Sequence, residues 1–176
     1  MLYALCKTIS TDKSKVTDNI AFLSAFLHIV CPAGAFLSAP YGEPVFSLLN
    51  FTGFYTYLSA RLDDTNGKLF HRDLKIFVSG TLFAIATTVR SNGVLSGMLF
   101  AYDAVVGLMG VVRSGISFPL IRRLVFVFLG GSLILIGTVG PQYVAYKIYC
   151  QDAVAPRSWC NNTIPSIYTW VQSYYW

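Results

Sequence analysis

Charged residues are scarce in this sequence. Asp, Glu, Lys and Arg make up 12% of the 176 residues, whereas the hydrophobic residues, counted as AVILMFWYC, make up 55%. A typical soluble domain has about 25% charged residues, so this chain has too few charges to cover the surface of a soluble globule. The same composition excludes a collagen, a coiled coil and an intrinsically disordered chain. A membrane protein with several spans remains.

Motifs that would indicate other classes of protein are also missing. The four cysteines are too few for a disulfide scaffold. No G-x-S-x-G, P-loop or G-x-G-x-x-G motif occurs, so nothing indicates a serine hydrolase, an NTPase or a dinucleotide enzyme. No Cys/His spacing predicts zinc, and we expect no metal site. Met1–Ser10 lacks the basic segment and apolar core of a signal peptide.

Five apolar stretches approach the roughly 20 residues that a spanning helix needs. They are residues 19–39, 44–60, 76–90, 94–112 and 120–139. The run from residue 76 to residue 112 would be about 55 Å long as one helix, but the hydrocarbon core is only about 30 Å thick. We therefore expect the polar stretch at residues 90–93 to divide it.

The predicted fold is an all-α integral membrane protein, a polytopic helical bundle with about five spans. We expect one transmembrane domain over residues 1–176 rather than several domains. Arg61–Lys75 contains the turn-forming sequence Asp63-Asp64-Thr65-Asn66-Gly67 and is predicted to be a polar loop. Residues 140–176 are predicted to form a polar, aromatic tail.

The basic residues predict how the chain is oriented in the membrane. With a cytosolic N-terminus and five crossings, the cytosolic segments hold 10 Lys and Arg residues and the opposite side holds three. Cytosolic loops carry an excess of Lys and Arg, so this orientation is favoured over its mirror image. It places residues 39–43, residues 90–93 and the tail together on the lumenal side. The net charge of +5 then indicates membrane orientation rather than binding of nucleic acid.

Three charged residues near or within the apolar stretches each allow two interpretations. Arg90 either binds an anion such as phosphate through its planar guanidinium group or extends from a helix end to the lipid head groups. Position alone favours the head groups. Glu43 either orders a sugar or acts as a base, or it is a first-turn carboxylate beside Pro44 at a helix N-terminus. Asp103 is either a functional intramembrane acid or a structural, hydrogen-bonded one.

The tail contains three features of a lumenal segment. Cys150 and Cys160 lie on the same predicted side, where a disulfide is permitted, although two separate thiols fit the sequence equally well. Asn161-Asn162-Thr163 is an N-glycosylation sequon. Asn50-Phe51-Thr52 matches the same pattern but lies inside a predicted span. The aromatic residues, Trp159 among them, are typical of a membrane interface and can also stack on sugars.

Three stretches of the sequence resemble the GPI mannosyltransferase 2 (PIG-V) family. The first is FLSAPYGEPVF at residues 36–46, and the second is AIATTVRSNG at residues 84–93. The third combines WCN at residues 159–161, IPSIYTWVQS at residues 164–173 and the final Tyr175-Trp176. The third is the most specific, because it is long and uncommon in composition. The resemblance runs from about residue 20 to the last residue.

The resemblance implies a GT-C-like glycosyltransferase, a multi-pass protein of the endoplasmic reticulum membrane. Such an enzyme would transfer the second mannose, in α-1,6 linkage, to the GPI glycolipid precursor in the lumen. The implied donor is dolichol-phosphate-mannose, so no cofactor and no nucleotide sugar are expected. The implied partners are the lipid-linked donor, the GPI glycolipid acceptor and the membrane, without nucleic acid. A small membrane subunit is also allowed as a partner.

Position and motif together select the candidate substrate-binding residues, which are Glu43, Arg90, Asn92, Trp159 and Gln172. Arg90 is assigned to the phosphate or glycolipid, Glu43 to a sugar or a structural network, and Asn92 to the turn or to polar groups. Asn161 is the glycosylation candidate.

One feature departs from the family pattern. The catalytic acid of such enzymes is expected in the first lumenal loop, near the start of a longer protein. Here the first lumenal loop, at residues 39–43, resembles a later part of the pattern. We therefore expect the chain to be a fragment that lacks the catalytic acid and is inactive alone. The alternative is a non-catalytic membrane subunit or a transporter fragment, in which Asp103 and Arg90 line a path.

Overall fold

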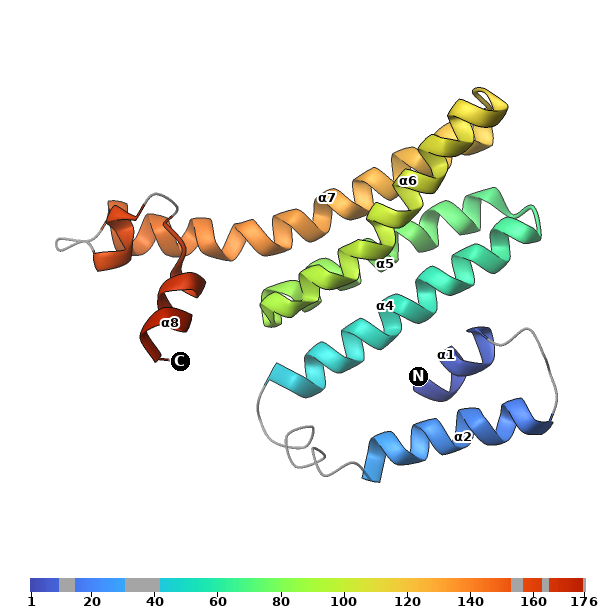
Figure 1. Cartoon of the computed structure of the whole chain (residues 1–176), viewed down its shortest axis with the longest axis horizontal. Helices are drawn as coiled ribbons and strands as arrows, with labels where there is room; N and C mark the ends of the chain where they lie inside the picture. The colour runs from blue at the N-terminus through green and yellow to red at the C-terminus, as the bar shows by residue number, and fades with distance from the viewer. Residues whose placement is uncertain (10–14, 31–41, 153–156, 163–164, 176) are drawn as a thin grey trace.

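The computed structural model describes residues 1–9, 15–30, 42–152, 157–162 and 165–175 (Figure 1). The secondary structure within these ranges is helical and contains no strand, which confirms the all-α prediction. The α-helices are α1 (Leu2–Ile9), α2 (Lys15–Val30), α4 (Gly42–Thr65), α5 (Leu69–Val89), α6 (Gly97–Ser114), α7 (Phe118–Tyr146) and α8 (Ile167–Tyr175). Short helices are η1 (Ser91–Ser96), the π-helical η2 (Lys147–Gln151) and η3 (Ser158–Asn161).

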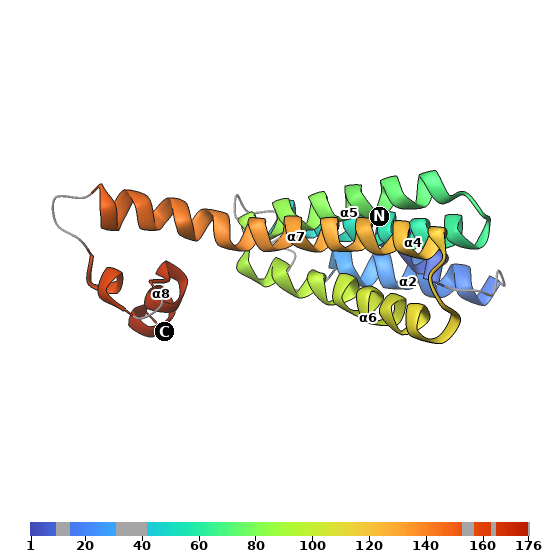
Figure 2. The ribbon, with the colours of Figure 1, turned by 90° about the horizontal axis from the view of Figure 1, so that it is seen from above.

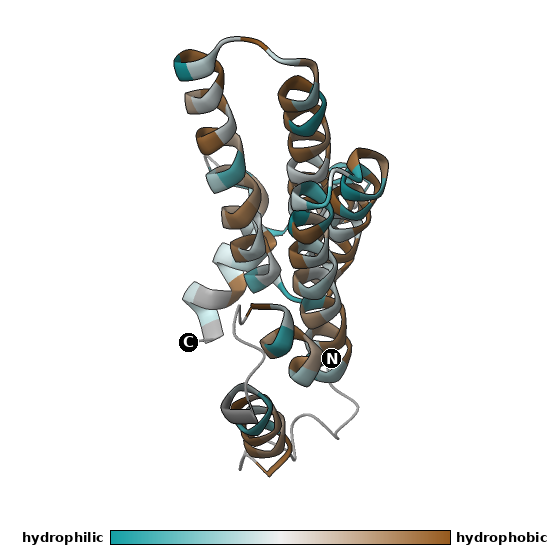
Figure 3. Cartoon of the chain, turned by 90° about the vertical axis from the view of Figure 1, so that its right-hand side faces the viewer, coloured by the Kyte–Doolittle hydropathy of each residue, from teal (hydrophilic) through white to brown (hydrophobic). Residues whose placement is uncertain are grey.

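Four long helices form the body of the protein. Helix α5 packs against both α4 and α7, and α6 packs against α7 (Figures 1 and 2). Helix α1 packs against α2 and α4, and α8 contacts α7. Helix α7 extends well beyond the ends of its neighbours, and η3 and α8 lie beside this extension (Figure 2). Hydrophobic residues run along the whole length of the long helices (Figure 3).

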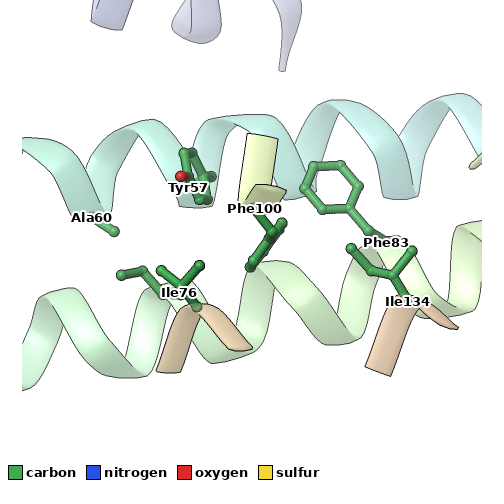
Figure 4. Close-up of a cluster of buried hydrophobic side chains, with 7 residues drawn as sticks. Tyr57, Ala60, Ile76, Phe83, Phe100 and Ile134 are labelled. Carbon is green, nitrogen blue, oxygen red and sulfur yellow. The ribbon is translucent and has the colours of Figure 1, made fainter. Parts of the chain in front are cut away.

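The core is formed by one or two apolar side chains from each of these four helices. Its buried members are Tyr57 and Ala60 of α4, Ile76 and Phe83 of α5, Phe100 of α6, and Val127 and Ile134 of α7 (Figure 4). The ring of Phe100 lies 5.3 Å from that of Tyr57 and 6.2 Å from that of Phe83. Tilted and edge-on ring pairs at such distances are favourable. Phe100 thereby packs α6 against both α4 and α5.

The predicted break near residue 90 is confirmed. Helix α5 ends at Val89, and η1 separates it from α6. The polar loop predicted over Arg61–Lys75 is wrong, because helix continues on both sides and only Asn66–Lys68 forms the turn. The acidic and basic side chains of this region pair with one another across helices, so they do not need a loop to reach water. Helix α7 continues past residue 139, through Pro141, to Tyr146.

Within the part of the chain that the structure describes, two helical stretches are long and apolar enough to cross a membrane. They are Ser91–Ser114 and Phe118–Gln151, and the shorter Thr17–Val30 is also apolar. The predicted number of five spans is therefore not confirmed. Residues 31–39 of the first predicted span lie outside the described residues, as does most of the loop predicted at residues 39–43. Large apolar side chains on the outer face, such as Val112 (86% exposed) and Ile136 (64%), fit a membrane environment.

Glycines bring α5 and α7 into close contact. A Cβ atom built on Gly80 would lie 2.5 Å from the Cα atom of Gly130, so any side chain there would separate the two helices. A Cβ atom on Gly137 would lie 2.5 Å from the carbonyl oxygen of Ala84. Small residues allow this approach between membrane helices, where packing replaces the hydrophobic effect as the driving force.

Alanine substitutions at two glycines of α7 test this contact. Gly137→Ala is expected to lower the free energy of unfolding by about 1–3 kcal/mol, because the new methyl group overpacks the interface. Gly140 is the matched control, since a Cβ atom there meets nothing within 4 Å among the described residues. Gly140→Ala is expected to leave stability unchanged or to raise it by up to about 1 kcal/mol. Denaturation in detergent, followed by circular dichroism, measures both, and equal effects would contradict the close contact.

Candidate functional site

The segment that begins at Arg90 folds back against the end of α5. Arg90 has an extended backbone (φ −142°, ψ 128°), and its N–H donates to the carbonyl of Ala86 at 2.9 Å. The N–H of Gly93 then donates to the carbonyl of Arg90 at 2.9 Å. A Cβ atom on Gly93 would lie 2.7 Å from the Cα atom of Thr87, so the turn requires glycine at this position.

Arg90 and Glu43, both predicted from sequence, lie together. The Arg90 Nη1 donates to the Glu43 Oε1 at 2.6 Å, which joins the end of α5 to the first turn of α4. The guanidinium carbon also lies 6.0 Å from the centre of the Phe46 ring. The side chains of Arg90 and Glu43 are 42% and 31% exposed. The first two stretches of the family resemblance are therefore in contact.

The Arg90–Glu43 pair has little effect on stability but fixes an orientation. Exposed ion pairs contribute about 0.2–1 kcal/mol, which is small beside the total stability of a domain. A guanidinium group has several N–H donors, and within the described residues only Nη1 of Arg90 bonds to a carboxylate. The remaining donors can bind a second anion while Glu43 holds the group in place.

A hydrogen bond that the sequence did not predict supports the same region. The Ser96 Oγ donates to the Asn50 Oδ1 at 2.8 Å, which links the end of η1 to α4. Ser96 is buried. The segment at residues 90–96 is thus attached to α4 at both ends. The ion pair of Arg90 with Glu43 holds its start, and the neutral hydrogen bond of Ser96 with Asn50 holds its end. The presence of a polar Asn50 within an apolar stretch was the only sequence signal for it.

The other predicted site residues do not join this pair. Asn92 is exposed on η1, in the same turn as Arg90. Trp159 is buried (2% exposed) in η3, so its ring is not available to a ligand in this conformation. Gln172 lies on α8, and its side chain is outside the described residues. Both η3 and α8 lie beside the far part of α7 (Figures 1 and 2).

The tail contains a disulfide bond between Cys150 and Cys160. The sequence had left open whether these cysteines are bonded. The bond joins the π-helical extension of α7 to η3 across a sequence separation of 10 residues. The Ser166 Oγ also bonds to the Gln142 Oε1 at 2.7 Å, which attaches the segment before α8 to α7.

A second polar cluster, which we call the Asp103 network, lies on the side predicted to be cytosolic. The Asp103 side chain is only 1% exposed. Its Oδ1 accepts from Arg123 at 2.7 Å and forms an ion pair with Arg61 at 2.9 Å. Its Oδ2 accepts from the Tyr57 hydroxyl at 2.5 Å. Both carboxylate oxygens are therefore engaged, which favours the structural interpretation of this acid.

The network continues from α6 into α5 through shared acids. Asp64 accepts from Arg123 at 3.3 Å and from Arg72 at 2.7 Å. Asp73, which is 2% exposed, accepts from Arg72 at 2.8 Å and also pairs with Arg122. Side chains of α4, α5, α6 and α7 all contribute. In the sequence these arginines indicated only the orientation of the chain, and their acidic partners were not predicted.

One ion pair beside the network lies next to the turn at Asn66–Lys68. The Lys75 Nζ lies 2.6 Å from the Asp63 Oδ2. The adjacent Lys75 ammonium group lowers the pKa of the Asp63 carboxyl below its usual value. This ion pair connects the end of α4 to α5.

Comparisons with known proteins agree with the resemblance noted above. A family model described as "Mannosyltransferase (PIG-V)" matches residues 1–176. The chain is 52% identical over 175 residues to a protein of Aspergillus oryzae, covering 99% of this chain. It is 48% identical over 176 residues to one of Aspergillus fumigatus and 36% identical over 192 residues to one of Chaetomium globosum, covering 100% of this chain in both. All three are named GPI mannosyltransferase 2.

The chain spans 40% of the length of each of these relatives. No solved structure matches it.

Neutralisation of Asp103 tests the structural interpretation of the network. Asp103→Asn keeps the shape of the side chain but leaves Arg61 and Arg123 without a full counter-charge. Breaking a buried ion pair in this way costs about 3–5 kcal/mol. The control is Arg113→Gln, since Arg113 is exposed and forms no ion pair among the described residues. It is expected to change stability by less than about 0.5 kcal/mol. Denaturation in detergent measures both, and similar small effects would overturn the interpretation.

Proposed function

We propose that this chain, which belongs to the mannosyltransferase (PIG-V) family, is part of a mannosyltransferase of GPI-anchor biosynthesis. The names of its relatives support this, at 36–52% identity over the whole chain. Because the chain spans 40% of their length, the activity is assigned to a protein of that length. The proposed location is the membrane of the endoplasmic reticulum, in a multi-pass arrangement.

The proposed reaction is the transfer of the second mannose, in α-1,6 linkage, from dolichol-phosphate-mannose to the GPI glycolipid. An acceptor hydroxyl would attack the anomeric carbon, and the bond from this carbon to the phosphate oxygen would break. Negative charge then increases on the departing dolichol phosphate. Charged groups placed in advance where such charge develops are the usual means of lowering the barrier.

The Arg90–Glu43 pair is the observation that supports a role for this chain. It lies on the side predicted to be lumenal, and it joins two of the three stretches that resemble the family. We assign Arg90 to the departing phosphate, because its N–H donors that have no partner among the described residues fit phosphate oxygens in a bidentate arrangement. Glu43 is assigned to positioning Arg90 rather than to proton transfer, since its Oε1 already accepts from the guanidinium. No catalytic base is assigned within this chain.

The alternative of a transporter or a non-catalytic subunit is not favoured by any contact that we observe. That alternative requires Asp103 and Arg90 to line the same path. Asp103 is instead held by Tyr57, Arg61 and Arg123 in the network predicted to be cytosolic. Arg90 lies at the other end of α5 from that network, which includes Arg72 and Asp73 near the start of the helix.

Substitution of Arg90 in the full-length protein tests its role. Removing one group that stabilises developing charge typically lowers kcat about 100- to 1,000-fold. We expect a loss of this size for Arg90→Gln, and at least a tenfold loss for Arg90→Lys, which retains the charge but not the bidentate geometry. Transfer of mannose from dolichol-phosphate-mannose in isolated membranes measures the effect. The matched control is Arg157→Lys, another exposed arginine on the predicted lumenal side, which should retain full activity.

Two outcomes would contradict parts of this proposal. Full activity of Arg90→Lys would exclude the bidentate phosphate contact. Failure of the complete reading frame to rescue cells that lack the second GPI mannose would contradict the transferase function itself. The unfolding midpoint of each variant should match that of the parent, because the exposed Arg90–Glu43 pair contributes little to stability.

A further inference from the structure

The tail carries a sequence motif that the proposed transferase function does not use. We propose that Asn161 is a site of N-linked glycosylation on the lumenal face of the protein. Asn161-Asn162-Thr163 is one of two sequons in the chain. The inference depends on the membrane orientation and location proposed above, but it does not depend on the transferase chemistry.

The side chain of Asn161 is open to a modifying enzyme. Asn161 is exposed at the end of η3, and its amide forms no hydrogen bond among the described residues. The backbone around it is held in place, because Trp159 is buried and Cys160 is bonded to Cys150. The backbone N–H of Asn162 also donates to the carbonyl of Trp159 at 3.3 Å.

Helix geometry places this segment outside the hydrocarbon core. The adjacent residues Arg122 and Arg123 mark the end of α7 that we predict to be cytosolic. From Arg123 to Tyr146 the helix rises about 35 Å at 1.5 Å per residue. The hydrocarbon core is only about 30 Å thick. The π-helical turn, the disulfide and Asn161 therefore follow after the helix has left the core on the opposite side.

The state of the cysteines agrees with this orientation. Disulfides persist in oxidising compartments and are rare in the cytosol. Cys150 and Cys160, on the predicted lumenal side, are bonded, whereas Cys6, on the predicted cytosolic side, is a free thiol. The distribution of Lys and Arg and the pairing of cysteines are independent features, and both assign Asn161 to the lumen.

The second sequon provides a contrast within the same chain. Asn50 lies inside α4, and its side-chain oxygen accepts the hydrogen bond from the buried Ser96. Modification there would require α4 to leave the bundle. Of the two sequons, only that of Asn161 has an amide that is exposed and has no hydrogen bond among the described residues.

The modification is a glycosyl transfer by a separate membrane-bound oligosaccharyltransferase. The Asn161 Nδ2 would attack C1 of the first sugar in a lipid-diphosphate-linked oligosaccharide. The bond between C1 and the diphosphate oxygen would break, and the lipid diphosphate would leave with the electron pair. A base of the transferase would accept the amide proton, so that an N-glycosidic bond replaces an N–H bond.

Gel mobility of the full-length protein, expressed in fungal cells, tests the proposal. Treatment with an amidase that removes N-glycans should shift the parent protein by one glycan more than the Asn161→Gln variant. Asn162→Gln is the matched control, because it changes the neighbouring exposed amide but leaves the sequon intact, and it should retain the shift. Asn50→Gln should also retain it. Conversion of Asn161 to aspartate by the amidase, detected by mass spectrometry, would locate the modification directly.

The outcomes separate this proposal from the transferase function. Identical shifts for the parent and Asn161→Gln, with no conversion of Asn161, would overturn the proposal even if the reading frame restores GPI synthesis. Glycosylation of Asn161 in a protein that fails to restore GPI synthesis would support the proposal and contradict only the transferase function. Loss of the shift in Asn162→Gln would also overturn the assignment, since the intact sequon would then not be sufficient.

Discussion

A carboxylate buried among apolar helices must be neutralised by its neighbours, and Asp103 imposes this requirement on the bundle. An unpaired ion costs several kcal/mol to remove from water even after the protein relaxes. Asp103 is therefore compatible with α6 only where Arg61 of α4 and Arg123 of α7 both reach it. Since the partners come from different helices, the positions of these helices along the bundle axis are fixed at this point. Asp64 and Arg72 extend the same requirement to α5.

The position of Arg90 follows from this arrangement. Helix α5 rises about 30 Å from its first turn to Arg90, so its far end is determined by how its near end and its middle are held. The Asp103 network holds the near end, and the contact of Gly80 with Gly130 holds the middle against α7. Arg90 then reaches Glu43 without a large contribution from the ion pair itself.

The sequence predicted the parts of this arrangement that depend on local or averaged properties. The apolar composition predicted helices in a membrane, and the charge at residues 90–93 predicted the break between α5 and α6. Periodicity and turn residues could not predict that Asp64 pairs with Arg72 and Arg123, because these contacts join helices far apart in sequence. The polar segment at residues 61–75 was therefore mistaken for a loop. The bond between Cys150 and Cys160 was undecided for a similar reason, since spacing alone does not determine pairing.

The two charge clusters show how burial decides the role of an ion pair. Asp103 is 1% exposed and its oxygens are fully engaged, so exchange of a partner would leave a buried charge uncompensated. The side chains of Arg90 and Glu43 are 42% and 31% exposed, so water can replace either partner at little cost. A group that must bind and release a charged lipid needs the second kind of environment. The chain thus uses arginine and carboxylate at both ends of α5, as a fixed connection on the predicted cytosolic side and as an exchangeable one on the predicted lumenal side.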